Sequence, residues 1–137
     1  MSNDKVETIV KWRGEMKFVG ENSAGNTVDM NPQQSDGIRP TQMALMAIGG
    51  CTGVDVVQML KKMKQPLEGL SIKVDGVRRQ EHPRTYETIT IKYYFSGKLD
   101  ERKVKRAVRL SQEKYCGVSN MFVPTAELKY EWEIETT

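Results

Sequence analysis

The sequence predicts one α+β domain over residues 1–137, with the element order β-β-β-α-β-β-α-β. Two observations predict this class. The run from Met43 to Leu60 is apolar on nearly all sides of a helix, whereas several other segments alternate apolar and polar residues with the period of a strand. A length of 137 residues fits one domain with a modest core, and no internal repeat or linker divides the chain.

Three short strands are expected in the N-terminal part. Alternation and turn signals place them at 6–13, 16–19 and 27–30. Gly14 and Glu15 fit the turn between the first two strands, and a polar loop over 21–26 precedes the third. The polar segment 31–40 contains prolines and a glycine, which predicts a connecting loop.

The long apolar helix follows this loop. We expect it to begin near Pro40 or Thr41, because proline is tolerated in the first helical turn and threonine is a suitable cap. It should run to about Lys64 and end before Pro66. A helix that is apolar nearly all round is expected to be buried rather than to lie on a surface.

Three glycines interrupt this helix at Gly49, Gly50 and Gly53. Each destabilises a helix interior by roughly 1 kcal/mol relative to alanine, so their presence needs a compensating reason. Close approach by another backbone is the simplest reason. In a chain of this size, we expect that backbone to belong to a second copy of the same helix.

The C-terminal part is predicted to contain three longer strands and one helix. Alternation places the strands at 69–75, 86–95 and 126–135. A turn is expected at 81–84, and Asp100 is expected to cap a basic amphipathic helix over 101–115. The last strand is expected to be antiparallel, with one solvent-exposed face. The inward side of the helix is expected to carry Leu99, Val104, Ala107, Val108, Ser111 and Tyr115.

Charge and hydropathy exclude several classes of protein. The 21 basic and 18 acidic residues give a net charge of +3, which is too balanced to predict nucleic-acid binding. The basic cluster over 98–109 is interpreted as the solvated face of a helix. No apolar run approaches about 18 residues, so we expect no membrane association. The N-terminus lacks an apolar signal segment, so we expect a cytoplasmic protein with reduced thiols.

Known motifs for cofactors are missing from the sequence. It has two cysteines and one histidine, His82, without CxxC or HxxxH spacing, so no metal site is expected. No GxGxxG, P-loop or GxSxG pattern occurs, so neither a nucleotide cofactor nor a serine nucleophile is expected.

The two cysteines are the candidate reactive groups. Cys51 lies within the apolar helix beside a glycine pair, and Cys116 closes the basic helix. A thiolate that attacks a peroxide becomes a sulfenic acid, and a nearby thiol condenses with it to a disulfide. The spacing is compatible with such a peroxidatic and resolving pair. From spacing alone, two unrelated cysteines that act as small buried hydrophobes are the more usual case.

A peroxidatic thiol must ionise, and a nearby cation lowers its pKa. Cys51 lies about eleven residues into its helix, too far for the dipole of the helix N-terminus to assist. Asp55, four residues on, shares its helix face and opposes ionisation unless a cation lies between them. Arg13 and Arg39 are candidates for that cation, although an arginine is more often an ordinary surface residue.

Two segments resemble the OsmC/Ohr family, named for osmotically inducible protein C and the organic hydroperoxide resistance protein. Residues 37–52 resemble the family segment in which a proline opens the central helix and the reactive cysteine follows eleven residues later. Residues 114–120 resemble its second motif, in which a serine follows the cysteine by three residues. Residues 12–17 resemble the first hairpin of the family, and the element order also matches.

The resemblance implies an intertwined homodimer, in which two sheets wrap around the paired central helices and two active sites form at the interface. It also implies reduction of organic hydroperoxides without a cofactor. Cys51 would attack the peroxide, Cys116 would resolve the sulfenic acid, and an external dithiol would restore both thiols.

The chain departs from the peroxidases of the family at three positions. Phe18 stands where they carry an arginine, Thr41 where they carry a glutamate, and Gly117 where proline is frequent. The signature with Asp55 resembles the YhfA-like branch. Two alternatives therefore accompany the peroxidase interpretation. One is a redox-sensing or small apolar ligand-binding protein on the same scaffold, and the other is a structural dimer with packing cysteines.

Overall fold

The computed structural model describes residues 5–33 and 37–136, which form two compact units. The first unit comprises residues 1–44 and the second comprises residues 45–137. Each unit is described by itself below. The assignment of residues 1–137 to one domain stays a prediction.

The first unit holds a small antiparallel sheet in the order β1-β2-β3. Its strands are β1 (Thr8–Trp12), β2 (Phe18–Asn22) and β3 (Thr27–Met30). The predicted strands are thus present, but the second starts two residues later than expected. The turn before it is wider than the predicted pair, because Gly14 and Glu15 both adopt positive φ and the Arg13 N–H donates to the Lys17 carbonyl at 2.7 Å.

Helix α1 spans Pro40–Lys62 and begins at the predicted proline. It ends two residues earlier than expected, where Lys64 adopts a left-handed φ of 58° and the Gln65 N–H donates to the Leu60 carbonyl. By length and composition α1 could span a membrane, which is weak evidence by itself. Core helices of soluble proteins have the same properties.

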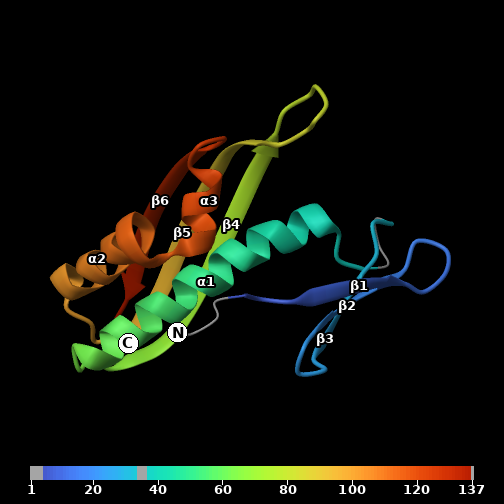
Figure 1. The fold of residues 1–137 in the computed structure, drawn as a ribbon. Coiled ribbons are helices and arrows are strands. Elements are labelled where there is room, and N and C mark those ends of the chain that lie inside the picture. Colours follow the sequence, from blue (N-terminus) through green and yellow to red (C-terminus); the bar gives the residue numbers. More distant parts are fainter. Residues whose placement is uncertain (1–4, 34–36, 137) are drawn as a thin grey trace. The chain divides into compact units, whose positions relative to one another are not determined.

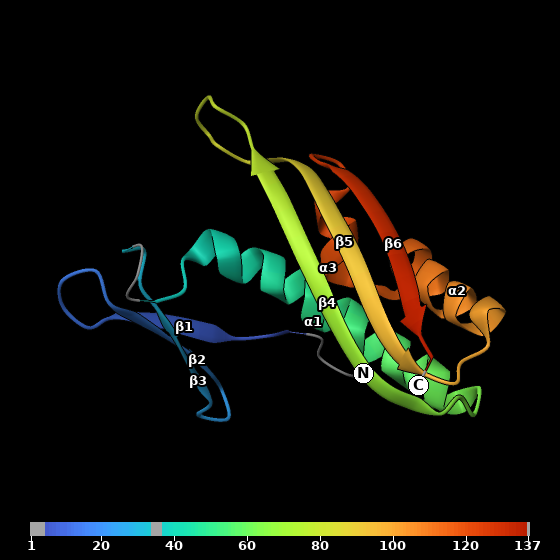
Figure 2. The ribbon, with the colours of Figure 1, turned by 180° about the vertical axis from the view of Figure 1, so that it is seen from behind.

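The second unit contains a three-stranded sheet covered by helices on one face (Figure 1 and Figure 2). Its strands are β4 (Leu67–Arg78), β5 (Tyr86–Gly97) and β6 (Glu127–Glu135), in that order across the sheet. After β5 come α2 (Glu101–Leu110), a π-helical turn η1 (Ser111–Tyr115) and α3 (Gly117–Phe122). As predicted, Asp100 caps α2, since its Oδ1 accepts from the Arg102 N–H at 2.9 Å.

Three details of this unit differ from the sequence-based expectation. Strand β6 is parallel to β5 rather than antiparallel, because the helical segment returns the chain to the end of the sheet where β5 begins. The predicted helix over 101–115 changes to a π turn after Leu110, and α3 was not predicted. The extra residue per turn rotates Tyr115 outward, so it is 54% exposed instead of inward.

The core of the second unit lies between the helices and the sheet. Tyr93 and Phe95 stack with ring centroids 5.9 Å apart. The fully buried apolar residues come from α1, β5 and α2, and include Ile48, Val56, Leu60, Ile89, Ile91, Val104, Ala107 and Val108. The outer face of β6 alternates as predicted, with Glu131 and Glu133 exposed.

Helix α1 has two different sides. Its buried residues, Ile48, Thr52, Val56 and Leu60, form a single stripe with a spacing of four. Met46 and Val54 are 54% and 58% exposed. Within one chain, α1 is therefore packed along one stripe rather than all round.

The helix glycines also divide between these sides. A Cβ on Gly49 would lie 3.3 Å from Val74 Cγ2, and one on Gly53 would lie 3.2 Å from Ile72 Cδ1. These two glycines thus fit against side chains of β4 in the same chain, not against another backbone as expected. A Cβ on Gly50 would meet no heavy atom within 4 Å.

Substitution of Gly76 should destabilise the second unit. A Cβ there would lie 2.5 Å from the Tyr86 ring and 3.2 Å from Leu45, so Gly76→Val should lower the free energy of unfolding by about 1–3 kcal/mol. The neighbouring Val77 is 59% exposed, and Val77→Ala should change it by less than about 0.5 kcal/mol. Urea unfolding of both variants measures this difference, and equal losses would contradict the packing described here.

Candidate active site

The fold places the two cysteines in the second unit. Cys51 lies in the middle of α1 and is half-buried, whereas Cys116 lies between η1 and α3 and is fully buried. Both are free thiols. Cys51 is among the groups that raise the pKa of the Cys116 thiol, so the two side chains lie near each other despite their separation in sequence.

Cys116 is held by contacts to its backbone and its sulfur. Its N–H donates to the Ser111 carbonyl at 2.7 Å, which closes the π turn. Its thiol donates to Ser119 Oγ at 3.1 Å, and the Ser119 N–H donates to Sγ at 3.4 Å. Asn120 Nδ2 donates to the Cys116 carbonyl at 2.8 Å and to the Gln112 carbonyl at 3.1 Å. The direction of this thiol is therefore fixed by its surroundings.

Burial raises the pKa of the Cys116 thiol above its usual range, because the thiolate loses the stabilisation that water provides. Hydrogen bonds with Ser119 oppose this shift, and the neighbouring Cys51 adds to it. Cys116 therefore carries its proton at neutral pH. Since the thiolate is the attacking species, this environment suits a second, resolving thiol better than a first nucleophile.

A buried network of polar side chains lies next to Cys51 along α1. Thr52 Oγ1 is 2.7 Å from the Tyr93 hydroxyl and 2.6 Å from Ser111 Oγ. Gln112 Nε2 donates to the Tyr93 hydroxyl at 2.7 Å and to Thr52 Oγ1 at 3.3 Å. Among the described residues, no buried side-chain nitrogen or oxygen lacks a partner. Satisfied networks of this kind fix the positions of the elements that contribute to them.

Burial also raises the pKa of Tyr93, while hydrogen bonds from Thr52 and Gln112 lower it in part. The charge of Cys116 adds to the increase, which links the phenol electrostatically to the thiol site. The phenol is therefore neutral at physiological pH, and it acts in this network as an uncharged hydroxyl.

Asp55 closes the network on the side of the solvent. It is half-buried, and its Oδ2 accepts from Ser111 Oγ at 3.0 Å. No salt bridge joins Asp55 to an arginine or lysine within residues 5–33 and 37–136. Within this part of the chain, the Ser111 hydroxyl is therefore a hydrogen-bond partner of Asp55, and a cation between Asp55 and Cys51 stays a prediction.

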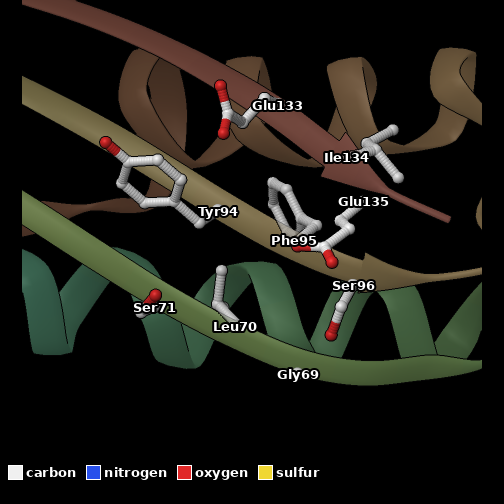
Figure 3. Close-up of a pocket in the computed structure, with 9 residues that line it drawn as sticks. All are labelled: Gly69, Leu70, Ser71, Tyr94, Phe95, Ser96, Glu133, Ile134 and Glu135. Carbon is white, nitrogen blue, oxygen red and sulfur yellow. The ribbon is translucent and has the colours of Figure 1, made fainter. Parts of the chain in front are cut away.

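Asp55 also lines a cleft of about 410 Å³ between α1 and the α2–η1 segment. Met59, Lys62, Arg106 and Tyr115 are among its other lining residues. The cleft is therefore lined by apolar side chains and by charged side chains of both signs. A second cavity, of about 540 Å³, lies on the sheet and is lined by residues of all three strands (Figure 3). That cavity holds no thiol.

The two predicted arginines lie in the first unit. Arg13 is exposed at the turn after β1, and Arg39 is half-buried just before α1, where its N–H donates to Gln42 Oε1 at 2.9 Å. Cys51, Asp55 and Cys116 lie in the second unit. A role for either arginine beside Cys51 stays a prediction.

Most of the polar network was not expected from the sequence. Ser111 was expected on the inward side of its helix. A serine at such an apolar position needs a polar partner, and this was the signal that the sequence offered. Thr52 gave the same signal within the apolar helix. As for metals, the described residues contain no group of three or more histidine, cysteine or acidic residues that could hold an ion.

Comparison with known proteins identifies the family. A family model described as OsmC-like protein matches residues 33–131. The protein YhfA of Escherichia coli K12 is 35% identical over 131 residues, which cover 94% of this chain and 98% of YhfA. The chain belongs to the OsmC-like protein family. The predicted resemblance to its YhfA-like branch is thereby confirmed.

Solved structures agree with the OsmC-like fold. A hypothetical protein from Aquifex aeolicus VF5 is 36% identical, with a TM-score of 0.90 and coverage of 98% of this chain and 99% of that one. The organic hydroperoxide resistance protein OhrB of Bacillus subtilis is 15% identical, with a TM-score of 0.65 and coverage of 94% and 98%. The second likeness shows the fold alone. Family membership supports a redox or peroxide-related role and a soluble fold.

The raised pKa of Cys116 predicts how the stability of this OsmC-like protein changes with pH. The native thiol keeps its proton to a higher pH than the unfolded thiol, so the free energy of unfolding should fall as pH rises above about 8.5. Cys116→Ser should remove this decrease. Urea unfolding between about pH 7 and about pH 9.5 isolates the thiol, because tyrosine titrates near 10.

The matched control is Tyr93→Phe, which removes a neighbouring ionisable group and should keep the decrease within this range. A slope in Cys116→Ser equal to that of the wild type would show that another group causes the alkaline effect.

Proposed function

We propose that this protein is a cytoplasmic, cysteine-dependent peroxidase that reduces organic hydroperoxides through a Cys51–Cys116 thiol/disulfide cycle. The observation that supports it is the meeting of two free thiols with different environments, one half-buried and one fully buried. Family membership supports the same chemistry. The residues that react all belong to the chain, so the cycle needs no cofactor.

The first step oxidises Cys51. Its thiolate attacks one oxygen of the hydroperoxide, a sulfur–oxygen bond forms, and the oxygen–oxygen bond breaks. The alcohol leaves after it takes up a proton, and Cys51 becomes a sulfenic acid. The partial exposure of Cys51 gives the peroxide access to this sulfur.

The second step forms the disulfide. Cys116 attacks the Cys51 sulfur, the sulfur–sulfur bond forms, and the hydroxyl group leaves as water with the proton of the Cys116 thiol. The burial of Cys116 keeps it from reacting with peroxide first. An external dithiol then reduces the disulfide by thiol–disulfide exchange.

We also propose that the protein works as an intertwined homodimer. The outward side of α1 carries the exposed apolar residues Met46 and Val54 together with Gly50, which has open space above it. Contiguous apolar surface of this kind is typical of interaction sites. A second copy of α1 is the occupant that this side of the helix would fit.

A specific alternative is a redox-sensing or small apolar ligand-binding protein on the same scaffold. It is favoured by Phe18 and Thr41 at positions where family peroxidases carry an ion pair, and by the hydroxyl partner of Asp55. The methionine-lined cleft beside Asp55 could hold a small apolar ligand in that case.

Oxidation by peroxide tests the proposed cycle. Limiting cumene hydroperoxide should convert wild-type protein to an intramolecular Cys51–Cys116 disulfide, because the thiols are neighbours. Cys116→Ser should stop at sulfenic or overoxidised Cys51, and Cys51→Ser should lose rapid reaction altogether. Mass spectrometry measures the products. If wild-type thiols disappear no faster than a free cysteine peptide, the alternative function takes over.

Sedimentation tests the proposed assembly. The wild type should be a dimer at micromolar concentration, and Gly50→Leu should shift it to monomer, because added bulk destabilises a close helix contact. Gly117 also has open space above its Cα and serves as a control, so Gly117→Leu should stay dimeric. A folded, monomeric wild type would exclude the dimer.

A further inference from the structure

Two hydrogen bonds connect the segments that carry the two thiols. Thr52 directly follows Cys51 on α1, and its Oγ1 is 2.6 Å from Ser111 Oγ. The carbonyl of the same Ser111 accepts from the Cys116 N–H at 2.7 Å. One residue, Ser111, therefore binds the Cys51 segment with its side chain and the Cys116 segment with its backbone.

From this connection we infer that Thr52 and Ser111 are positioning residues, which hold Cys116 in register with Cys51 so that the two sulfurs can form a disulfide. The inference rests on the proposed thiol pairing but does not require a peroxide as the oxidant. It assigns to the pair a role in the resolving step and none in the first attack on peroxide.

The π turn makes this arrangement specific. In a regular helix the Cys116 N–H would donate to the residue four positions before it, whereas here it donates five positions back, to Ser111. The Ser111 carbonyl thus anchors the end of the turn, while the Ser111 side chain anchors its start to α1. Loss of the Thr52–Ser111 contact would displace the π turn relative to α1 and move Cys116 away from Cys51.

Both residues can be changed without leaving a buried polar group unpaired. In Ser111→Ala, Thr52 Oγ1 keeps its bonds with Tyr93 and Gln112, and Asp55 faces the cleft. In Thr52→Val, Tyr93 keeps Gln112, and Ser111 keeps Asp55 as a partner. Removing a hydroxyl destabilises a protein less when its former partners keep other hydrogen bonds than when a partner is left unpaired. Both variants should therefore fold.

The test measures how readily the thiols pair, without peroxide. The protein is equilibrated with reduced and oxidised glutathione, and the ratio of dithiol to intramolecular disulfide gives the effective concentration of the pair. Electrons balance, since one oxidised glutathione becomes two reduced molecules for each protein disulfide. Thr52→Val and Ser111→Ala should each lower the effective concentration by about fivefold.

Thr52→Ser keeps the hydroxyl and should restore the wild-type value, which a role in apolar packing would not explain. The double variant Thr52→Val/Ser111→Ala should resemble the single variants, because both remove one shared bond. Ser96→Ala, a serine deletion on β5 outside the network, should leave the value unchanged. Full additivity in the double variant, or no rescue by Thr52→Ser, would overturn the inference.

A second readout separates positioning from general damage. With Cys116→Ser as background, Ser111→Ala should change the rate of Cys51 oxidation by cumene hydroperoxide by a smaller factor than it changes the effective concentration. Equal losses in this rate and in the effective concentration would indicate a distorted fold and overturn the inference. If the wild type ignores peroxide but Thr52→Val still lowers the effective concentration, the peroxidase proposal fails and the positioning inference stands.

Discussion

The hydrogen bonding of one buried threonine is the constraint on which the site depends. Thr52 is the polar member of the buried stripe of α1, and a hydroxyl in that position must find partners or destabilise the fold. Tyr93, Ser111 and Gln112 supply them from β5 and η1. Satisfying Thr52 therefore fixes the π turn against α1, and the turn carries Cys116.

The same burial separates the properties of the two thiols. Cys116 lies in a low-polarity environment that favours its protonated form, and its hydrogen bonds with Ser119 define its direction. Cys51 remains partly exposed on α1. In the proposed cycle, the more accessible Cys51 would therefore react with the oxidant first and the protected Cys116 second.

Helix α1 has one side that packs in the core and another side that would form the proposed interface. Gly49 and Gly53 let it approach β4 closely, with Cβ positions 3.3 and 3.2 Å from side chains of that strand. Gly50, Met46 and Val54 point away from this packing and have space or solvent around them. The helix is thus apolar on both of these sides, and a single chain covers only one of them.

Local chemistry in the sequence determined the start of α1 at Pro40 and the cap at Asp100, because proline geometry and side-chain capping act within a few residues. The sequence also indicated both cysteines as candidate reactive residues, since their motifs are continuous in the chain. The tertiary structure decided the parallel pairing of β6, the π turn at Ser111 and the meeting of Cys51 with Cys116. Each of these depends on contacts between residues distant in the chain. The pattern of apolar and polar residues along the chain does not predict such contacts.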